Sequence, residues 1–306
     1  MPCAPGLPAL PRWWKVAKHD FPGGTMCRYL RRYLERGHMY EVGSALIVFF
    51  MMLAGAGIGV LVKPLLPEEH KAHETVQLIQ LVVGMLVTFA ALVLGLMTAS
   101  AKASFDTAGN DFRAFASDLI QLDIRLRDYG PETDAARRLL RAYTAAAIAT
   151  TWPQEPPPAG DFYPKDLSHP GDNPERLESM RLGDLLDQAE REIRRLTPHD
   201  AFHVRLADDI LAQFLETRRA RWKLIEEAHS SISQPFFLTL VFWLFVIFLA
   251  FGLIAPRNAL ALVTIMLGAL SIASAMYVIV DLDTPLTGPI VISSQPMRDA
   301  LVHLSR

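Results

Sequence analysis

Residues 78–98 read LIQLVVGMLVTFAALVLGLMT, a run of about 20 residues that carries no formal charge. A helix of that length crosses a hydrocarbon core of roughly 30 Å. The next proline is Pro131, so the helix is free to continue beyond the membrane through Lys102 and Asp106. The stretch therefore predicts a membrane-spanning helix that runs on into a polar region.

One face of this predicted span carries small and polar residues from end to end. Successive members lie three or four positions apart, the spacing of one helix face. This small-polar stripe consists of Gln80, Gly84, Thr88, Ala91, Gly95, Thr98 and Lys102. Two interpretations stay open, namely a close-packing seam between helices and the wall of a water-filled path.

The composition indicates membrane spans combined with a sizeable polar region. The 306 residues are 51% hydrophobic, yet 20% are charged, and the formal net charge is -2. That balance gives no strongly basic surface, so nucleic acid is not an expected partner. Cys3 and Cys27 both precede the first span, and their spacing suggests neither a disulfide framework nor a zinc site.

Three further apolar segments bring the number of predicted spans to four. The first covers about 42–62 and contains Gly55 and Gly59, which are one turn apart and would let another helix approach closely. The third and fourth cover about 236–255 and 259–280. The predicted fold class is all-α, an integral membrane protein with four transmembrane helices and a helical cytoplasmic region.

The predicted organisation follows from these spans and from proline content. Its parts are an N-terminal cytoplasmic leader (1–40), the first two spans (41–102), a cytoplasmic helical region (103–234) with a Pro-rich linker (152–174), the last two spans (235–280) and a cytoplasmic C-terminal tail (281–306). The leader is proline-rich and lacks the apolar stretch of a signal peptide. A translation start at Met26 or Met39 is an alternative explanation for its unusual composition.

Positive charge sets the predicted orientation, because Lys and Arg near span ends favour the cytoplasm. With four spans, most such residues fall on the side that holds both termini and the helical region. The opposite side has Lys63, Lys71 and Arg257. Both termini are therefore expected in the cytoplasm.

Four motifs spread along the chain form a recognisable set. In order they are KPLLPEEH (63–70), LGLMTASAKASFD (94–106), ISQPFF (232–237) and DLDTPLTGPIVISSQPMRDAL (281–301). Together they resemble a bacterial membrane family called bestrophin-like, whose members share a domain of unknown function. The resemblance covers about residues 40–304, and its last motif is the most specific. It implies a multi-pass protein of a bacterial inner (plasma) membrane.

The chain is also distantly similar to bestrophins, which are pentameric anion channels. This similarity rests on SFD (104–106) after the second span, on DTP (283–285) after the fourth, and on the order of the four spans. It implies a homo-oligomer, with a pentamer as its form, that conducts an inorganic anion. Bestrophins carry an aromatic-rich constriction on the second span, where this chain offers only Phe89, and the tryptophan pair that often follows that span is absent. An identical pore gate is therefore not expected.

The same similarity would place the small-polar stripe along the ion path. The implied pore-lining residues are Gln80, Gly84, Thr88, Gly95, Thr98 and Lys102. Hydroxyls and amides replace part of an anion's hydration shell, and a ring of lysines favours anions.

Three acids, Asp106, Asp281 and Asp283, are expected at the cytoplasmic mouth. Asp281 and Asp283 adjoin a proline turn and could bind a hard cation such as calcium. Ion pairing or turn capping is the alternative, because two acids fall short of the six to eight oxygens that calcium prefers. No metal site or cofactor is predicted.

Two histidine pairs have a spacing that could chelate a transition metal, His70 with His73 and His199 with His203. Neither pair has convincing third and fourth ligands, so solvated histidines are expected. A basic cluster precedes the third span and consists of Arg218, Arg219, Arg221 and Lys223. This cluster predicts contacts with anionic lipid headgroups, each worth about 1 kcal/mol, although the topology alone would also explain it.

Catalytic patterns are absent from the sequence. It contains no G-x-S-x-G, no Walker loop, no H-E-x-x-H and no G-x-G-x-x-G that opens a helix after a strand. The expected function is therefore not enzymatic but that of an oligomeric anion channel or ion-conducting pore lined by the second span. The alternative is a non-conducting membrane scaffold or sensor whose cytoplasmic helices bind a partner.

Overall fold

The structure, a computed structural model, describes residues 25–65, 73–160, 162–165, 180–227, 234–256 and 258–306. Within these ranges the chain is helical and contains no strand. Four of the helices are long and apolar enough to cross a membrane. The predicted all-α membrane protein with four spans is therefore confirmed.

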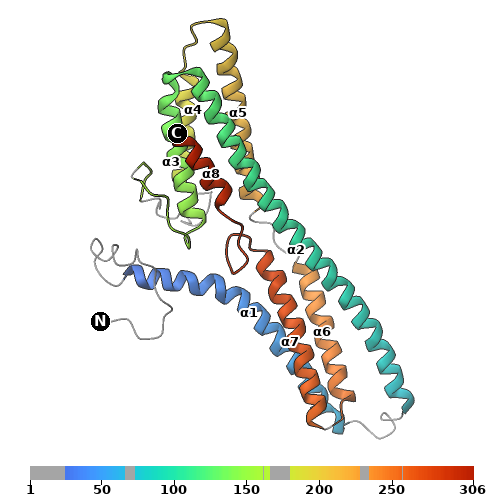
Figure 1. Cartoon of the computed structure of the whole chain (residues 1–306). Helices are drawn as coiled ribbons and strands as arrows, with labels where there is room; N and C mark the ends of the chain where they lie inside the picture. Colours follow the sequence, from blue (N-terminus) through green and yellow to red (C-terminus); the bar gives the residue numbers. More distant parts are fainter. Residues whose placement is uncertain (1–24, 66–72, 161, 166–179, 228–233, 257) are drawn as a thin grey trace.

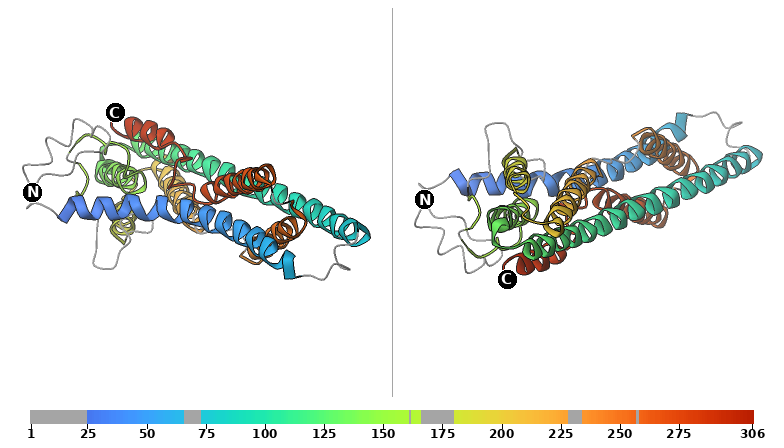
Figure 2. Two further views of the ribbon diagram at one scale, coloured as in Figure 1. Left: turned by 90° about the horizontal axis from the view of Figure 1, so that it is seen from below. Right: turned by 90° about the horizontal axis from the view of Figure 1, so that it is seen from above.

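The spans form a membrane bundle of four helices. These are α1 (Thr25–Val62), the first half of α2 (His73–Tyr129), α6 (Gln234–Ile254) and α7 (Ala259–Leu282). The short 3-10 turn η2 (Lys63–Leu65) follows α1. α6 and α7 each pack against both α1 and α2, as the views in Figure 2 show. Buried apolar side chains, including Met52, Leu240 and Phe248, fill the space between them.

Helix α2 runs nearly the length of the molecule (Figure 1). Its 57 residues span about 85 Å, because an α-helix rises about 1.5 Å per residue. It ends at Tyr129, since Gly130 has a φ of 119° and Pro131 cannot continue the ladder of hydrogen bonds. The prediction that this helix continues beyond its membrane span is confirmed.

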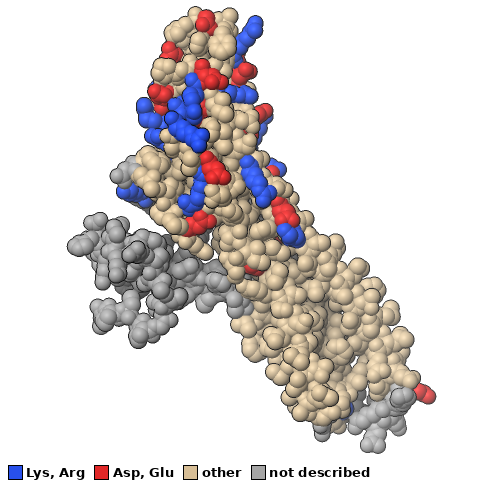
Figure 3. Space-filling view, in the orientation of Figure 1, with Lys and Arg blue, Asp and Glu red and all other residues tan. Residues whose placement is uncertain are grey.

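The second half of α2 belongs to a polar unit outside the membrane bundle. Its other members are η4 (Pro131–Thr133), α3 (Asp134–Thr151), α4 (Met180–Arg194), α5 (Ala201–Glu227) and α8 (Gln295–Leu304). α5 packs against α2, α4 against α3, and α8 against both α2 and α3. On the face shown in Figure 3, charged side chains gather over this unit and are nearly absent over the membrane bundle.

Helix α8 lies in what the sequence predicted only as a tail, and the preceding segment is attached to the polar unit. The indole nitrogen of Trp152 donates a 2.7 Å hydrogen bond to the carbonyl of Ile292. Nη2 of Arg298 lies 2.9 Å from Oε2 of Glu155, an oxygen that also bonds to the Ser294 hydroxyl. These contacts join the end of α7 to the polar unit through a short connection.

Helices α1 and α6 cross in close contact, as the spacing of Gly55 and Gly59 predicts. A Cβ on Gly59 would overlap the carbonyl oxygen of Leu249 and lie 2.9 Å from Cα of Gly252. A Cβ on Gly252 would in turn overlap the carbonyl oxygen of Ala56. The crossing therefore depends on the absence of side chains at these positions.

Gly59→Ala and Gly252→Ala are each expected to lower the free energy of unfolding by about 1–3 kcal/mol, because the facing backbones must separate. Thermal unfolding of the detergent-purified chain measures the change. Gly57→Ala is the matched control, since a Cβ on Gly57 meets nothing within 4 Å. The Gly59→Ala/Gly252→Ala variant should lose less than the sum, because one helix shift relieves both clashes. Equal melting temperatures for Gly57→Ala and Gly59→Ala would contradict this account.

Candidate functional site

The small-polar stripe lies on an exposed face of α2, and a different face packs against the bundle. The buried positions of α2 within the span are Val83, Ala90, Met97 and Ala101. Each is followed directly by a stripe residue, so the stripe is rotated by about 100° from the buried face. All seven stripe residues are exposed. The chain's own helices therefore leave the stripe uncovered.

The glycines of the stripe make no close helix contact within the chain. A Cβ added to Gly84 or Gly95 would meet nothing within 4 Å, in contrast to Gly59 on α1. Small size at these two positions is therefore not required for packing inside one chain. A packing seam here would have to involve a second copy.

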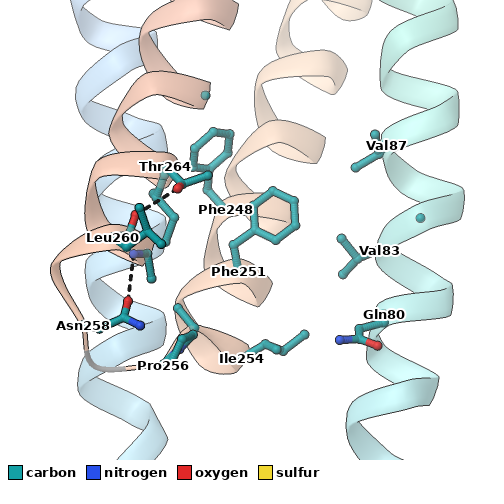
Figure 4. A pocket seen from close by; sticks show the side chains of 15 residues that line it. Gln80, Val83, Val87, Phe248, Phe251, Ile254, Pro256, Asn258, Leu260 and Thr264 are labelled. Atoms are coloured by element: carbon teal, nitrogen blue, oxygen red, sulfur yellow. Dashed lines mark hydrogen bonds between the residues drawn. The ribbon is translucent and has the colours of Figure 1, made fainter.

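The end of the stripe at Gln80 and Gly84 borders a cavity of about 780 Å³ between α2, α6 and α7. Figure 4 shows Gln80 and Val83 of α2 pointing toward Phe251 and Ile254 of α6 across this space. Most of its other lining side chains are apolar. Gln80 thus places an amide beside a mostly apolar hollow, which Asn258 and Thr264 also line.

The hydroxyls of the stripe are engaged with their own helix. Oγ1 of Thr88 donates to the carbonyl of Gly84 at 2.9 Å, and Oγ1 of Thr98 donates to that of Leu94 at 2.8 Å. These hydroxyls therefore turn lone pairs, not protons, toward the exposed side. Donor groups for an anion must come from amides or cations on the same face.

The charged end of the stripe is an ion pair within one helix. Nζ of Lys102 bonds to Oδ1 of Asp106 one turn later, and it lies 5.5 Å from the centre of the Phe105 ring. Both charged side chains are more than half exposed. Asp106 therefore offsets the positive charge that made Lys102 a candidate for attracting anions.

The three acids expected at the mouth have separate surroundings. Asp281 is buried, and its Oδ2 accepts a hydrogen bond of 3.2 Å from the backbone N–H of Ile290. Asp283 ends α7, where its N–H donates to the carbonyls of Ile279 and Asp281. Across the described ranges, no group of three or more His, Cys, Asp or Glu is placed to hold a metal ion. Asp281 and Asp283 therefore lie at the end of α7, whereas Asp106 pairs with Lys102 within α2.

His199, just before α5, and His203, in the first turn of α5, bond to different acids. Nε2 of His199 lies 2.9 Å from Oε1 of Glu132, and Nδ1 of His203 lies 2.9 Å from Oδ1 of Asp200. The other predicted pair falls outside the part of the chain whose side chains are described, as do leader residues 1–24 and linker residues 166–174.

The basic cluster before the third span is largely engaged inside the polar unit. Arg218 binds Glu190 and lies 3.4 Å from Asp187. Burial opposes ionisation of Glu190, but hydrogen bonds from Arg194 and Arg218 hold its pKa below the usual range. Glu190 therefore stays charged and holds Arg218 against α4.

The remaining members of the cluster differ in exposure. Nζ of Lys223 lies 2.8 Å from Oδ1 of Asp111. Arg221 is buried beside Tyr143. The pKa of Tyr143 is raised to about 12 because the phenol is buried, although the nearby Arg221 guanidinium partly offsets the rise. Arg219 is exposed, unlike the buried Arg221.

A buried carboxylate that the sequence did not single out connects three helices. Asp123 of α2 is fully buried and binds Arg127 one turn later. Its Oδ1 also lies 2.8 Å from Nε of Arg137 on α3, and its Oδ2 lies 3.8 Å from Nδ1 of His303 on α8. Its position among the apolar α2 residues 119, 122 and 126 was the available signal, because an acid on an apolar helix face needs a partner.

Comparisons with known proteins agree with this architecture. A family model described as Bestrophin-like domain matches residues 49–297. A point mutant of a bacterial bestrophin homologue from Klebsiella pneumoniae is 19% identical, with a TM-score of 0.56 over 86% of this chain and 99% of that chain. Another structure of a bestrophin homologue from that organism is 20% identical, with a TM-score of 0.55 over 83% and 96%. No curated protein matches. At such identities the solved structures show the fold alone, but the family model spans most of the sequence, so this chain belongs to the bestrophin-like family.

Proposed function

We propose that this protein forms a homo-oligomeric anion channel whose path follows the small-polar stripe of α2. The observation that carries the proposal is the exposure of the stripe along the whole span. Polar side chains such as Gln80 and Lys102 are unfavourable against lipid and are usually turned toward a protein interior or a water-filled cavity. Since one chain leaves them uncovered, copies of the chain would enclose them.

Closed rotational symmetry would supply that enclosure. A ring of copies places the same face of every α2 around one axis, and we propose five copies because the family's distant relatives, the bestrophins, are pentamers. Exposed leucines that flank the stripe on the side away from the buried face, including Leu81 and Leu92, would then face neighbouring copies or lipid. In this arrangement the polar unit and both termini lie in the cytoplasm of a bacterial inner membrane.

The chemistry of the path favours anions mainly near the polar unit. Within the span, Thr88 and Thr98 present lone pairs, and Gln80 supplies an amide donor at the outer end. Cations beyond the cytoplasmic end would raise the local anion concentration, because charge lining a pore selects ions of opposite sign. No described group resembles a catalytic site, and we propose conduction in place of catalysis.

The proposal is tested by native mass spectrometry of the detergent-purified chain together with chloride flux from liposomes. An oligomer that releases chloride is the expected result. A monomer without flux at any tested pH, voltage or calcium concentration would overturn the proposal and favour the scaffold or sensor alternative. An oligomer that passes only cations would retain the pore but refute the anion assignment.

A further inference from the structure

The exposed face of the stripe continues along α2 into the polar unit. Exposed polar residues follow at steps of three or four, and they form what is called here the α2 polar line. They are Lys102, Asp106, Asn110, Arg113, Ser117 and Gln121. By helix geometry Arg113 lies within about 20° of Lys102 and in nearly the same direction as Gly95. The α2 polar line is thus a continuation of the small-polar stripe.

Neighbouring members of the α2 polar line are bonded in pairs. Lys102 binds Asp106, Nη1 of Arg113 donates to Oδ1 of Asn110 at 2.6 Å, and Nε2 of Gln121 donates to Oγ of Ser117 at 3.3 Å. The first pair joins opposite charges. The other two pairs involve only neutral acceptors. Arg113 and Asn110 together therefore carry a net positive charge, whereas Lys102 and Asp106 together carry none.

The other charges on this part of α2 face different surroundings. Asp111 lies about 180° from Lys102 around the helix and binds Lys223 of α5. Asp118 is rotated by about 160° and is half-buried. Asp123 is fully buried between Arg127 and Arg137. Among the described residues, Arg113 is the charged side chain on the face of the α2 polar line that has no acidic partner.

We propose that Arg113 is the position that selects anions in this pore and that Lys102 adds little net charge because Asp106 offsets it. This inference rests on the proposed function, since it requires the α2 face to line the path. In a ring of copies, each chain contributes one guanidinium at the same level. A ring of guanidinium groups without acidic partners concentrates anions over about one Debye length, which is about 10 Å at 0.1 M salt.

The test measures reversal potentials of the purified full-length protein in planar bilayers under a potassium chloride gradient. Arg113→Gln is expected to lower the permeability of chloride relative to potassium by about fivefold, the scale of one unit charge at short range in water. The Lys102→Gln/Asp106→Asn variant, which removes the pair without changing net charge, should leave the ratio unchanged. Arg138→Gln, which removes an exposed arginine of α3, is the control for net charge alone.

The outcomes separate the two proposals. Wild-type current with an unchanged ratio in Arg113→Gln would overturn the role of Arg113 and leave the channel intact. A shift in Lys102→Gln/Asp106→Asn as large as that in Arg113→Gln would also overturn it. Absence of current from every variant and from the wild type would overturn the channel itself. The shift should shrink between about 0.01 M and 1 M salt, because the Debye length falls from about 30 Å to about 3 Å over that range.

Discussion

Gly95→Leu is expected to reduce chloride flux by tenfold or more while the protein stays folded and oligomeric. The new side chain would project from the exposed face between Thr88 and Lys102, where a Cβ meets nothing within the chain. In a ring of α2 helices, one leucine from each copy would form an apolar constriction, and such constrictions block ions by dewetting. Liposome flux at matched protein density, with the subunit count measured in parallel, provides the readout.

A control for added bulk is available on the same helix. Ser100 is exposed and lies about 140° from Gly95, so Ser100→Leu should leave the flux unchanged. Leucine is a better helix former than glycine by up to about 1 kcal/mol, so local unfolding would not explain a loss at residue 95. Normal flux from an intact Gly95→Leu oligomer would contradict the pore assignment. Dissociation of the oligomer would instead identify the stripe as a seam between copies.

Asp123→Ala should lower the free energy of unfolding by about 3–5 kcal/mol, the loss observed when one member of a buried ion pair is removed. Asp123 is fully buried, and Arg137, the partner on α3, is only one-fifth exposed. The substitution leaves the Arg137 guanidinium without the Asp123 carboxylate, which compensates the cost of removing Arg137 from water. Thermal unfolding of the purified chain should show a fall in melting temperature of about 10 °C.

An exposed acid near the same arginine provides the comparison. Oδ1 of Asp134 lies 3.6 Å from Nη1 of Arg137, but Asp134 is 53% exposed. Asp134→Ala should therefore cost less than about 1 kcal/mol. Adding Arg137→Met to Asp123→Ala should restore part of the stability, because the stranded charge is removed. If Asp123→Ala and Asp134→Ala melted at the same temperature, the buried network would not hold the polar unit together.

Local patterns in the tail indicate helix α8, but packing against the rest of the fold stabilises it. Residues 281–306 were predicted only as a tail, yet Ser294 and Pro296 stand at a helix start and four apolar residues follow at helical spacing. They are Met297, Ala300, Leu301 and Leu304. A helix of ten residues is marginal alone in water. Packing against α2 and α3 stabilises it, and that contact is invisible in the sequence of the tail.

The charges of α2 separate what spacing predicts from what only the fold decides. The pairing of Lys102 with Asp106 is a local i to i+4 relation, so it could have been predicted from the sequence. The pairing of Asp123 with Arg137 spans 14 positions and requires α3 to fold back on α2 after Gly130. The pairing of Arg113 with Asn110 is also local, at i to i+3, and the fold decides only that this face of α2 is exposed.

The sequence by itself determined four spans, the continuity of α2 and its end at Gly130, because apolar length, the absence of proline and backbone stereochemistry act locally. It also determined the existence of a small-polar stripe, which is a matter of spacing. The tertiary structure alone decided that this stripe is exposed. Both faces of a membrane helix are made of apolar or small residues, so hydropathy cannot tell which face is buried, and only the positions of α6 and α7 do so.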